Sequence, residues 1–372
     1  MNSDKQGRLR GAGIGRRMLF LGLLLAMASP LSAETLRVVS WGGSYARSQI
    51  LGFIRDFEEQ AGVRVEVLEY SGGIEEIRSQ VRSHNVRWDV VDLELFDAIR
   101  AGRKGLLELI APEQLAPAPD GTPARDDFIT GALMDHGVGN IVFSTVIAFK
   151  NAPNGKAPKR LDDLFNLSDF PGRRALRRTP VGNLEWALLA DGVDPESVYS
   201  LLETEQGLQR AFRMLDRIKP VTRWWSDGEQ AIAWIENGEV AMGAVFNGRA
   251  FDAARRGSLV EILWDRQITF FDVWGIPRNG RNTELAREFI RFATSSRSLA
   301  NQTQFISYGP VRKSSMELVE EEIRSQLPTA PDNLKTAFHS SPEWWSLHFD
   351  RINGRFERWL RMPVRVPEQL PR

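Results

Sequence analysis

The chain has 372 residues, enough for two ordinary domains, and its 48 basic side chains balance 48 acidic ones. This balance excludes the excess of positive charge by which proteins bind nucleic acid or anionic lipid in bulk. Because the chain has no cysteine, disulfide bonds, thiolate metal ligands and a cysteine nucleophile are excluded as well.

Residues 1–33 indicate an export signal that is not part of the fold. Basic residues, including Arg16 and Arg17, precede the apolar run 18–27, and small residues then lead to Ala33. This layout is typical of a secretory signal peptide cleaved near Ala33, since the apolar run is too short to span a membrane. An uncleaved anchor is the alternative, and the paired arginines leave both Sec and twin-arginine export open. We therefore expect a soluble periplasmic protein.

Residues 36–107 predict strand, helix, strand, helix and strand, in that order. The first strand covers 36–41, and the apolar residues after it have the spacing of a helix face: Ile50, Phe53, Ile54 and Phe57. Valine alternates with charged residues over 63–67, which predicts the second strand, and the apolar run 88–93 predicts the third. Strands that alternate with helices indicate a parallel sheet.

Ligands of a parallel sheet bind beyond the carboxyl ends of its strands. In this chain those ends carry aromatic and acidic residues, in the segments 41–45 and 94–96. The sequence therefore predicts ligand contacts at these positions, from Trp41, Tyr45, Glu94 and Phe96.

The rest of the chain predicts a second lobe and a return to the first. The apolar strand 141–149 is suited to cross between lobes, and the strand 269–276 is suited to return. Two α/β lobes joined by crossing strands form a cleft with a hinge, an arrangement that closes around a ligand. The predicted boundaries are 34–140 for the first part of lobe 1, 141–270 for lobe 2, and 271–372 for the return and the C-terminal helices.

Short motifs follow one another along the chain. They are Phe57-Glu-Glu-Gln-Ala-Gly62, Trp88-Asp-Val-Val with Gly105-Leu-Leu, Gly238-Glu-Val with Phe246-Asn-Gly, Asp272-Val-Trp-Gly-Ile-Pro277, and Tyr308-Gly-Pro. In these motifs and their order the chain resembles the periplasmic substrate-binding proteins of ABC importers, in the branch that includes spermidine- and putrescine-binding proteins. The resemblance covers residues 36–359, with Ser307 where the last motif of the family has glycine.

The resemblance implies a two-lobed α/β fold of the type II kind, with a ligand cleft between the lobes. In polyamine binders of this branch, aromatic rings enclose the methylene chain and carboxylates hold the ammonium ends. A cation on an aromatic face gains about 0.5–2 kcal/mol. Carried over by position, Asp272 is the amine-holding carboxylate and Glu94 is an additional acid. The aromatic wall would consist of Trp41, Phe96, Phe246 and Phe270, with Tyr308 nearby.

The chain also departs from polyamine binders. Where they carry a second pair of acids, this chain has the segment 179–183, which ends at Asn183, and two expected tryptophans are Phe246 and Phe270. Arg249, which follows the turn at Asn247, is suited to meet a ligand carboxylate. These departures favour a smaller cation or an amino-acid-like ligand about as well as a long polyamine.

The adjacent pair Trp224 and Trp225 is the last candidate for the cleft. Neighbouring residues on a strand point to opposite faces, so one ring packs in the core and the other faces out. We expect Trp225 to face the cleft.

The sequence gives little support to catalysis or metal binding. The four histidines lack metal-ligand spacing, no Gly-x-Ser-x-Gly motif occurs, and the four tyrosines include no adjacent pair of the kind that ferric sites use. We therefore expect no enzyme, catalytic residue, cofactor, bound metal or nucleic-acid partner.

The predicted function is the periplasmic solute-binding component of an ABC importer. It would be a monomer that captures a small cationic or amine-bearing, polyamine-like ligand by cleft closure and delivers it to the membrane permease and its ATPase. A zwitterionic amino-acid-like ligand, ferric ion on the same fold, and a ligand-loaded signalling adaptor remain as alternatives.

Overall fold

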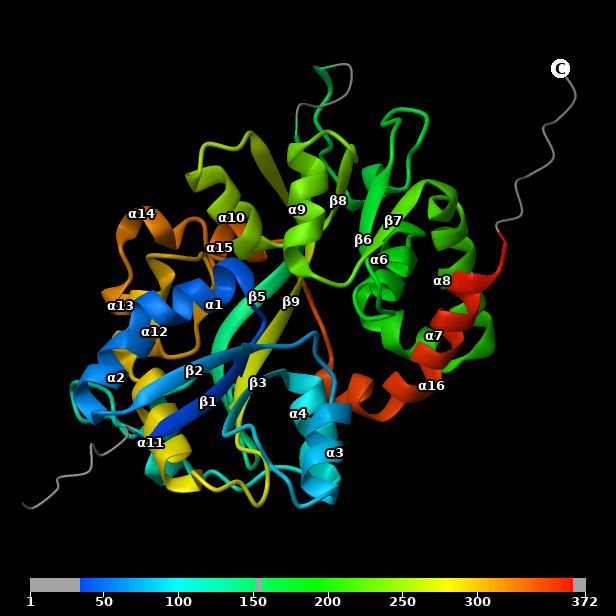
Figure 1. Ribbon diagram of the computed structural model, residues 1–372. Coiled ribbons are helices and arrows are strands. Elements are labelled where there is room, and N and C mark those ends of the chain that lie inside the picture. Colours follow the sequence, from blue (N-terminus) through cyan, green and yellow to red (C-terminus); the bar gives the residue numbers. More distant parts are fainter. Residues whose placement is uncertain (1–33, 151–154, 364–372) are drawn as a thin grey trace, which may run out of the picture. The chain divides into compact units, whose positions relative to one another are not determined.

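One mixed β-sheet runs through the protein, and the computed structural model describes residues 34–150 and 155–363 (Figure 1). The predicted signal peptide and its cleavage site near Ala33 lie outside the described residues. The strand order is β2-β1-β3-β9-β5-β8-β6-β7, and three short strands, β4, β10 and β11, pair with the two central members. The strands are β1 (Thr35–Ser40), β2 (Arg64–Glu69), β3 (Val90–Glu94), β4 (Leu133–Met134), β5 (Gly137–Lys150), β6 (Arg174–Arg177), β7 (Thr222–Trp225), β8 (Met242–Phe246), β9 (Val260–Gly275), β10 (Gly309–Pro310) and β11 (Phe338–His339).

Two long antiparallel strands, β5 and β9, connect the halves of the sheet. At one end of the pair, β3 joins the sheet through β9, and at the other end β8 joins it through β5. The pairing of β5 with β9 shifts register between Gly139 and Ile141 and again between Thr145 and Ile147. Such bulges bend a strand and increase its twist. These two strands are therefore the crossing strands of the two-lobed fold.

We call the half that contains β1, β2 and β3 lobe 1, and the half that contains β6, β7 and β8 lobe 2. Within each lobe these strands are parallel to one another, as the alternation of strands and helices in the sequence indicates. This architecture confirms the predicted fold class. The exact lobe boundaries stay a prediction.

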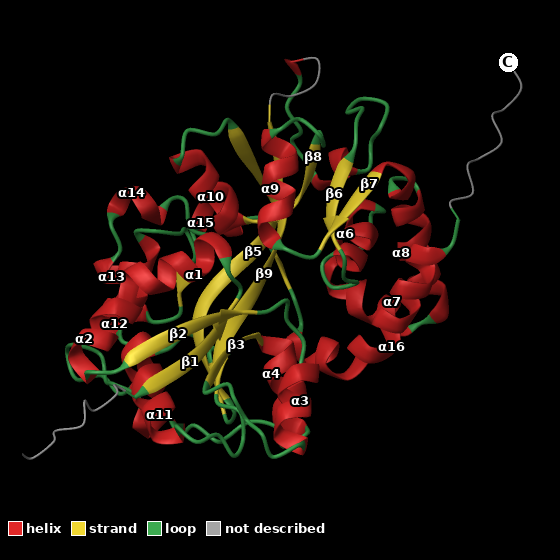
Figure 2. Ribbon diagram, in the orientation of Figure 1, coloured by secondary structure: helices red, strands yellow, loops and turns green. Residues whose placement is uncertain are grey.

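Helices cover both faces of the sheet (Figure 2). They are α1 (Gly43–Gln49), α2 (Arg55–Ala61), α3 (Glu75–Arg82), α4 (Leu95–Arg103), α5 (Ala124–Asp127), α6 (Asn183–Ala190), α7 (Val198–Glu203), α8 (Glu205–Asp216), α9 (Gly228–Glu236), α10 (Asn247–Arg255), α11 (Thr283–Ala293), α12 (Ser296–Thr303), α13 (Lys313–Leu318), α14 (Glu321–Arg324), α15 (Pro331–Leu334) and α16 (Pro342–Arg361). A π-helical segment, Ile50–Ile54, joins α1 to α2.

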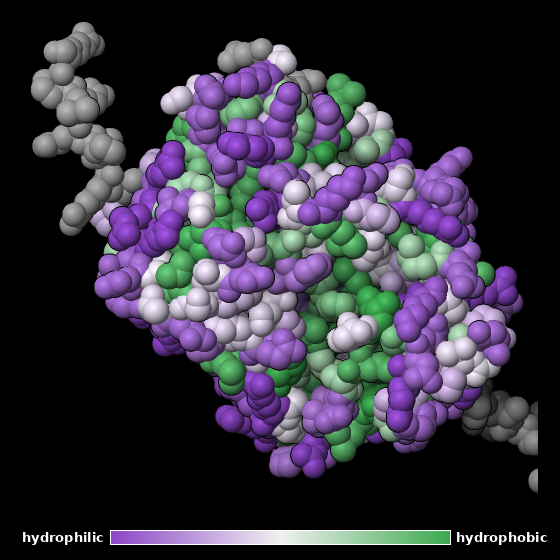
Figure 3. Space-filling model, turned by 180° about the vertical axis from the view of Figure 1, so that it is seen from behind, coloured by the Kyte–Doolittle hydropathy of each residue, from purple (hydrophilic) through white to green (hydrophobic). Residues whose placement is uncertain are grey.

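Each lobe has its own apolar core. In lobe 1, the ring of Phe289 on α11 packs against Phe53, Phe57 and Trp274. Burial of one such side chain stabilises the fold by about 1.5–3 kcal/mol. In lobe 2, α6, α7 and α8 form a second core together with α16. Seen from behind, hydrophilic residues cover much of the surface and hydrophobic residues gather near the middle of that face (Figure 3).

Helix α16 packs against both lobes. Near its start, Phe349 contacts Phe96 of lobe 1 at a ring-centroid distance of 5.2 Å. Near its end, Trp359 packs against Phe212 of lobe 2 at 5.3 Å. The C-terminal helix is therefore a third connection between the lobes, in addition to the crossing strands.

Two elements begin earlier than the sequence predicts. The apolar spacing predicts a helix from Ile50, whereas the helix begins at Gly43, because its first turns bury polar side chains such as Ser48 and Gln49. The sequence predicts a strand from 269, whereas β9 begins at Val260. The polar residues around Gln267 interrupt the apolar pattern by which the first part of this strand would be recognised. That amide is fully buried and donates to two backbone carbonyls.

Candidate ligand-binding site

The candidate site lies where the strand ends of the two lobes face each other. Trp41 follows β1 and Glu94 ends β3 in lobe 1, while Arg177 ends β6 and Phe246 ends β8 in lobe 2. The side chain of Arg177 reaches Glu94, with 2.5 Å between Nη1 and Oε1. The carboxyl ends of parallel strands therefore converge from both sides, as expected for a ligand cleft in this class of fold.

A small cavity lies at this meeting point. Its volume is about 20 Å³, room for no more than one or two water molecules. Its lining residues come from both lobes and from the crossing strands: Trp41, Tyr45, Glu94, Phe143, Phe246, Arg249, Asp272 and Tyr308. All of them except Phe143 are residues that the sequence predicts as ligand contacts. A ligand of several heavy atoms therefore requires side chains or lobes to move.

Two carboxylates stand side by side at the cavity. Glu94 on β3 and Asp272 on β9 are directly opposite each other in the antiparallel register, and each residue is only 4% exposed. Burial, and then the nearby carboxylates of Asp92 and Glu94, raise the pKa of Asp272 well above its ordinary value. Within the described structure its Oδ1 atom makes no hydrogen bond. Asp272 is thus an acid that a cationic partner would ionise.

A third carboxylate, Asp92, holds a cavity residue through a hydrogen bond. Its Oδ2 atom accepts from the hydroxyl of Tyr45 at 2.7 Å and from Nε2 of Gln49 at 2.8 Å. Burial raises the pKa of Asp92 to about 7, although both of these hydrogen bonds act in the opposite direction. The network fixes the ring of Tyr45, which lines the cavity.

Aromatic rings form the walls of the cavity. Phe143 stacks on Phe270 with 5.3 Å between ring centroids and meets Phe246 edge-on at the same distance. Tyr45 and Tyr308 pack edge-to-face at 5.5 Å. Their faces offer a cation the electrostatic attraction of an aromatic ring in a place largely shielded from water.

Arg249, on α10, links the two lobes beside the cavity. Its Nη1 atom donates to the carbonyl of Gly42 at 3.2 Å and also pairs with Glu229, while Nη2 donates to the carbonyl of Trp41 at 3.2 Å. Glu229 in turn accepts from the backbone N–H of Ser44 at 2.9 Å. The third guanidinium nitrogen, Nε, is buried and bonds to no described residue.

Glycine permits this close approach of the lobes. Gly43 has a φ of 55°, and a Cβ atom there would lie 2.4 Å from Oε1 of Glu229 and 2.5 Å from Nη1 of Arg249. Any other residue at this position would strain the backbone and displace the side chains of Glu229 and Arg249.

Two larger hollows lie outside the cavity in the same cleft. Their volumes are about 270 Å³ and 450 Å³, and both are lined by Trp41, Arg177 and Trp225 among others. Trp225 borders both hollows, but its side chain is only 1% exposed and packs in a core of lobe 2, so its role in ligand contact stays a prediction. Its neighbour Trp224 packs against Phe356 of α16 instead.

Four other predicted ligand contacts are not among the residues that line the small cavity. Phe96 lines the smaller hollow. Phe270 stacks on the ring of Phe143, which lines the cavity. The amide of Asn183 donates to the carbonyls of Arg177 and Thr179. Asn247 accepts from the N–H of Ser144 and donates to the carbonyl of Ser307. Both asparagines thus satisfy backbone groups, and a role in ligand contact stays a prediction for all four.

Three residues of the site are absent from the sequence-based predictions: Phe143, which lines the cavity, and the charged residues Arg177 and Glu229 beside it. Arg177 stands at the carboxyl end of β6, so the same rule that selects Trp41 and Glu94 would have found it. The run of arginines at 173, 174, 177 and 178 hides which of them faces the cleft. Glu229 lies in the first turn of a helix, where an acid is common for local reasons, and its cross-lobe role has no sequence signal.

Buried acids predict that the protein is more stable in weak acid than in weak base. Burial raises the pKa of Asp92 and of Glu185 to about 7 and that of Asp97 to about 6. These groups hold protons more tightly in the folded than in the unfolded state, so stability falls as the pH rises from about 4 through these values. We expect the melting temperature at pH 8.0 to be lower than at pH 5.5 by about 3 °C or more at constant ionic strength. An equal or higher value at pH 8.0 would contradict this view of the acids.

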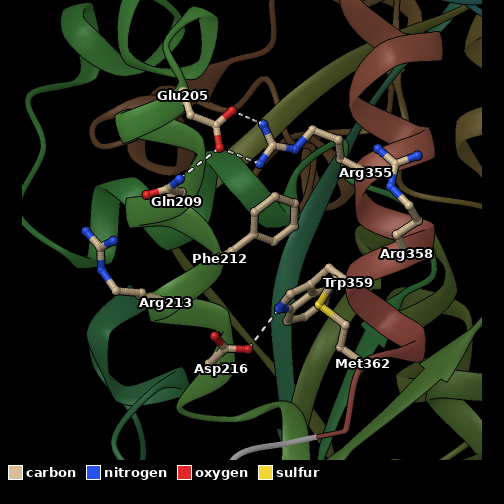
Figure 4. Close-up of a pocket in the computed structure, with 9 residues that line it drawn as sticks. All are labelled: Glu205, Gln209, Phe212, Arg213, Asp216, Arg355, Arg358, Trp359 and Met362. Atoms are coloured by element: carbon tan, nitrogen blue, oxygen red, sulfur yellow. Dashed lines mark hydrogen bonds and ion pairs between the residues drawn. The ribbon is translucent and has the colours of Figure 1, made fainter.

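A separate groove lies between α8 and the end of α16 (Figure 4). It has a volume of about 660 Å³, and Phe212 and Trp359 form its apolar floor. Along its sides Glu205 accepts from Arg355 and Gln209, and the indole of Trp359 donates to Asp216. It contains none of the residues that the sequence predicts as ligand contacts.

Residues 34–150 and 155–363 contain no helix that is both long and apolar enough to cross a membrane. The same residues contain no group of three or more acidic or histidine side chains placed to hold a metal ion.

Comparisons with known proteins agree with the geometry. The model of the bacterial extracellular solute-binding protein family matches residues 52–329. The gamma-aminobutyric acid-binding protein of Pseudomonas aeruginosa is 34% identical over 348 residues, which cover 94% of this chain and 97% of that protein. The solved structure of a GABA receptor is 30% identical with a TM-score of 0.77, and the match covers 90% of this chain and 100% of that one.

A polyamine binder matches over a shorter stretch. The spermidine/putrescine-binding periplasmic protein of Salmonella typhimurium is 27% identical over 127 residues, which are 34% of this chain and 36% of that protein.

The family model and the match over nearly the whole chain confirm the predicted family. The chain belongs to the bacterial extracellular solute-binding proteins, the non-enzymatic binding components of ABC-type transport systems.

Proposed function

We propose that this protein captures a small ligand with one ammonium group and one carboxylate, of the size of γ-aminobutyrate. One observation carries the proposal. The aromatic cavity is lined by a buried carboxylate, Asp272, and by a buried guanidinium, Arg249, and each has one atom without a hydrogen-bond partner among the described residues. An unsatisfied buried acceptor and donor cost free energy, which a ligand with complementary groups would recover.

The ligand's two ends have separate partners in this proposal. Its ammonium group lies against Asp272 and the aromatic walls, and its carboxylate lies against Arg249. Asp272 belongs to a crossing strand and Arg249 belongs to lobe 2. The guanidinium of Arg249 also donates to the backbone carbonyl of Trp41 in lobe 1. A ligand between these two groups therefore favours the closed arrangement of the lobes, and it shifts the population towards that form.

A long polyamine suits this cavity less well. The positively charged side chains of Arg249, which lines the cavity, and of Arg177, which stands at its edge, would repel the additional ammonium groups of a polyamine. The comparisons support the same choice, because a relative that matches nearly the whole chain is named for γ-aminobutyrate, whereas the polyamine binder matches about a third. The proposal thus favours the zwitterionic alternative of the sequence reasoning over its polyamine-like ligand.

In the cell, the proposed role is delivery. The protein would be exported to the periplasm, with its signal peptide cleaved near Ala33, and would present the closed, loaded form to the permease and ATPase of an ABC importer. A role as a signalling adaptor would use the same closed form. Loss of ligand uptake on deletion of the gene would support transport.

A thermal-shift screen tests the ligand class. A ligand that binds only the folded state raises the melting temperature by mass action. The purified protein is screened with γ-aminobutyrate and its shorter and longer homologues, with putrescine and spermidine, with sugars and organic acids, and with ferric ion. The proposal expects the largest shift from an ω-amino acid. A larger shift from a polyamine or from ferric ion would reject it.

Replacing Trp41 with alanine should weaken ligand binding without unfolding the protein. The ring lines the cavity and both hollows, and it packs against Tyr70 at 5.0 Å on its other side. Loss of the ring removes an aromatic wall worth about 0.5–2 kcal/mol to a bound cation. We expect a dissociation constant about 3- to 30-fold higher by calorimetry, with a melting transition still cooperative. Leu347→Ala, at an exposed position on α16, is the control.

A further inference from the structure

Arg177 stands at the boundary between the small cavity and the outer cleft. It lines both hollows but does not line the cavity. Its ion-pair partner, Glu94, does line the cavity. Its guanidinium carbon lies 5.3 Å from the centroid of the Phe246 ring. The side chain is 22% exposed, and that of Glu94 is 5% exposed. A cation of the protein itself therefore occupies both a carboxylate and an aromatic face at the edge of the site.

The charges at the cavity can be counted. Glu94 and Asp272 are cross-strand partners, which places their Cβ atoms about 5 Å apart on the same face of the sheet. Two neighbouring acids are suited to hold the two ammonium groups of a diamine. Arg177 already neutralises Glu94, so Asp272 is left as the acid with an unpartnered oxygen. A second ammonium group near Glu94 would meet the positive charge of Arg177 instead of a free carboxylate.

We propose that Arg177 is a specificity-determining residue, which admits ligands with one ammonium group and rejects diamines. This inference rests on the proposed function, in which Asp272 holds a single ammonium group. It adds a repulsive element to the site, and selective binding often depends on such an element as much as on attraction. Like charges brought together in a buried site are costly, so the loss of this one charge should have a large effect on diamine binding.

A matched set of variants separates the charge of Arg177 from its bulk. Arg177→Gln removes the charge, whereas Arg177→Lys keeps it at the same position. The neighbouring Arg178 provides a control, because it pairs with Glu357 of α16 rather than with a cavity acid. Putrescine and γ-aminobutyrate are titrated calorimetrically into the wild-type protein and into each variant.

The expected result is a gain of diamine binding that follows the charge. Arg177→Gln should bind putrescine at least about 30-fold more tightly than the wild-type protein does. Arg177→Lys should stay as weak as the wild type, and Arg178→Gln should change putrescine affinity by no more than about fivefold. If Arg177→Gln fails to fold, Arg177→Met, which keeps the aliphatic stem, takes its place.

Three results would overturn the inference. They are tight putrescine binding by the wild-type protein, no gain in the folded uncharged variant, and an equal gain in Arg177→Lys. The two ligands keep this test separate from that of the proposed function. Putrescine gain without any wild-type binding of γ-aminobutyrate would reject the proposed ligand and support the role of Arg177. Wild-type binding of γ-aminobutyrate without putrescine gain would do the reverse.

Discussion

Replacing Asp272 with asparagine is expected to raise the dissociation constant for γ-aminobutyrate at least about 30-fold. The carboxylate is buried beside the cavity, and its Oδ1 atom has no partner in the described part of the chain. Loss of one member of a buried, charged hydrogen-bonded pair costs about 2–5 kcal/mol, because the remaining charge is left without compensation. Calorimetric titration of the variant measures the effect directly.

A matched substitution controls for this change. Asp350→Asn alters an acid on α16 that pairs with Arg100 and is 69% exposed, so its effect on binding should stay within about fivefold. An Asp272→Asn protein that binds as the wild type does would remove Asp272 from the site.

The Asp272→Asn variant should be no less stable than the wild type when no ligand is added. Because the pKa of Asp272 is raised in the folded state, its ionisation opposes folding as the pH rises above the unfolded value near 4. Asparagine carries no such charge, so we expect a melting temperature at pH 8 that equals or exceeds that of the wild type. A binding site whose acid weakens the fold on its own is consistent with selection for function over stability.

The second large effect is expected at Arg249. Arg249→Gln should weaken binding of γ-aminobutyrate at least about 30-fold, since it removes the charged partner of the ligand carboxylate. It should affect butylamine, which has no carboxylate, by much less. Calorimetric titration of both ligands gives the comparison. An equal loss for both ligands would mean that Arg249 acts only by holding the lobes together.

Glu229→Gln separates these two roles of Arg249. It disrupts the ion pair between Arg249 and α9 but keeps the guanidinium at the cavity. We therefore expect it to weaken binding less than Arg249→Gln does. A greater loss in Glu229→Gln would indicate that the contact between the lobes, rather than the carboxylate partner, dominates the affinity.

Much of lobe 1 could be predicted from sequence because its helices and strands repeat their apolar residues with the periods of those structures. The helix face from Ile50 to Phe57 and the apolar strand that ends at Glu94 are examples. The start of β9 could not be predicted, because the apolar pattern fails where Gln267 is buried through hydrogen bonds to distant carbonyls. Periodicity does not report burial of that kind.

The candidate site could be predicted where its residues stand at the ends of strands. Trp41, Glu94 and Phe246 each end or follow a strand, and all three line the cavity. The pairing of Arg177 with Glu94 was not predictable, since these residues lie 83 positions apart and belong to different lobes. The residues at a strand end show which side chains that end can offer a ligand. Charge pairing across a cleft depends on the tertiary fold.

One calorimetric experiment tests the central claim that the site reads one ammonium group and one carboxylate together. The wild-type protein is titrated with γ-aminobutyrate, butylamine, butyrate and putrescine, four ligands that share a four-carbon chain and differ in their charged ends. We expect γ-aminobutyrate to bind at least about 30-fold more tightly than each of the others, because only it satisfies both Asp272 and Arg249. Equal or tighter binding of butylamine, butyrate or putrescine would contradict the claim.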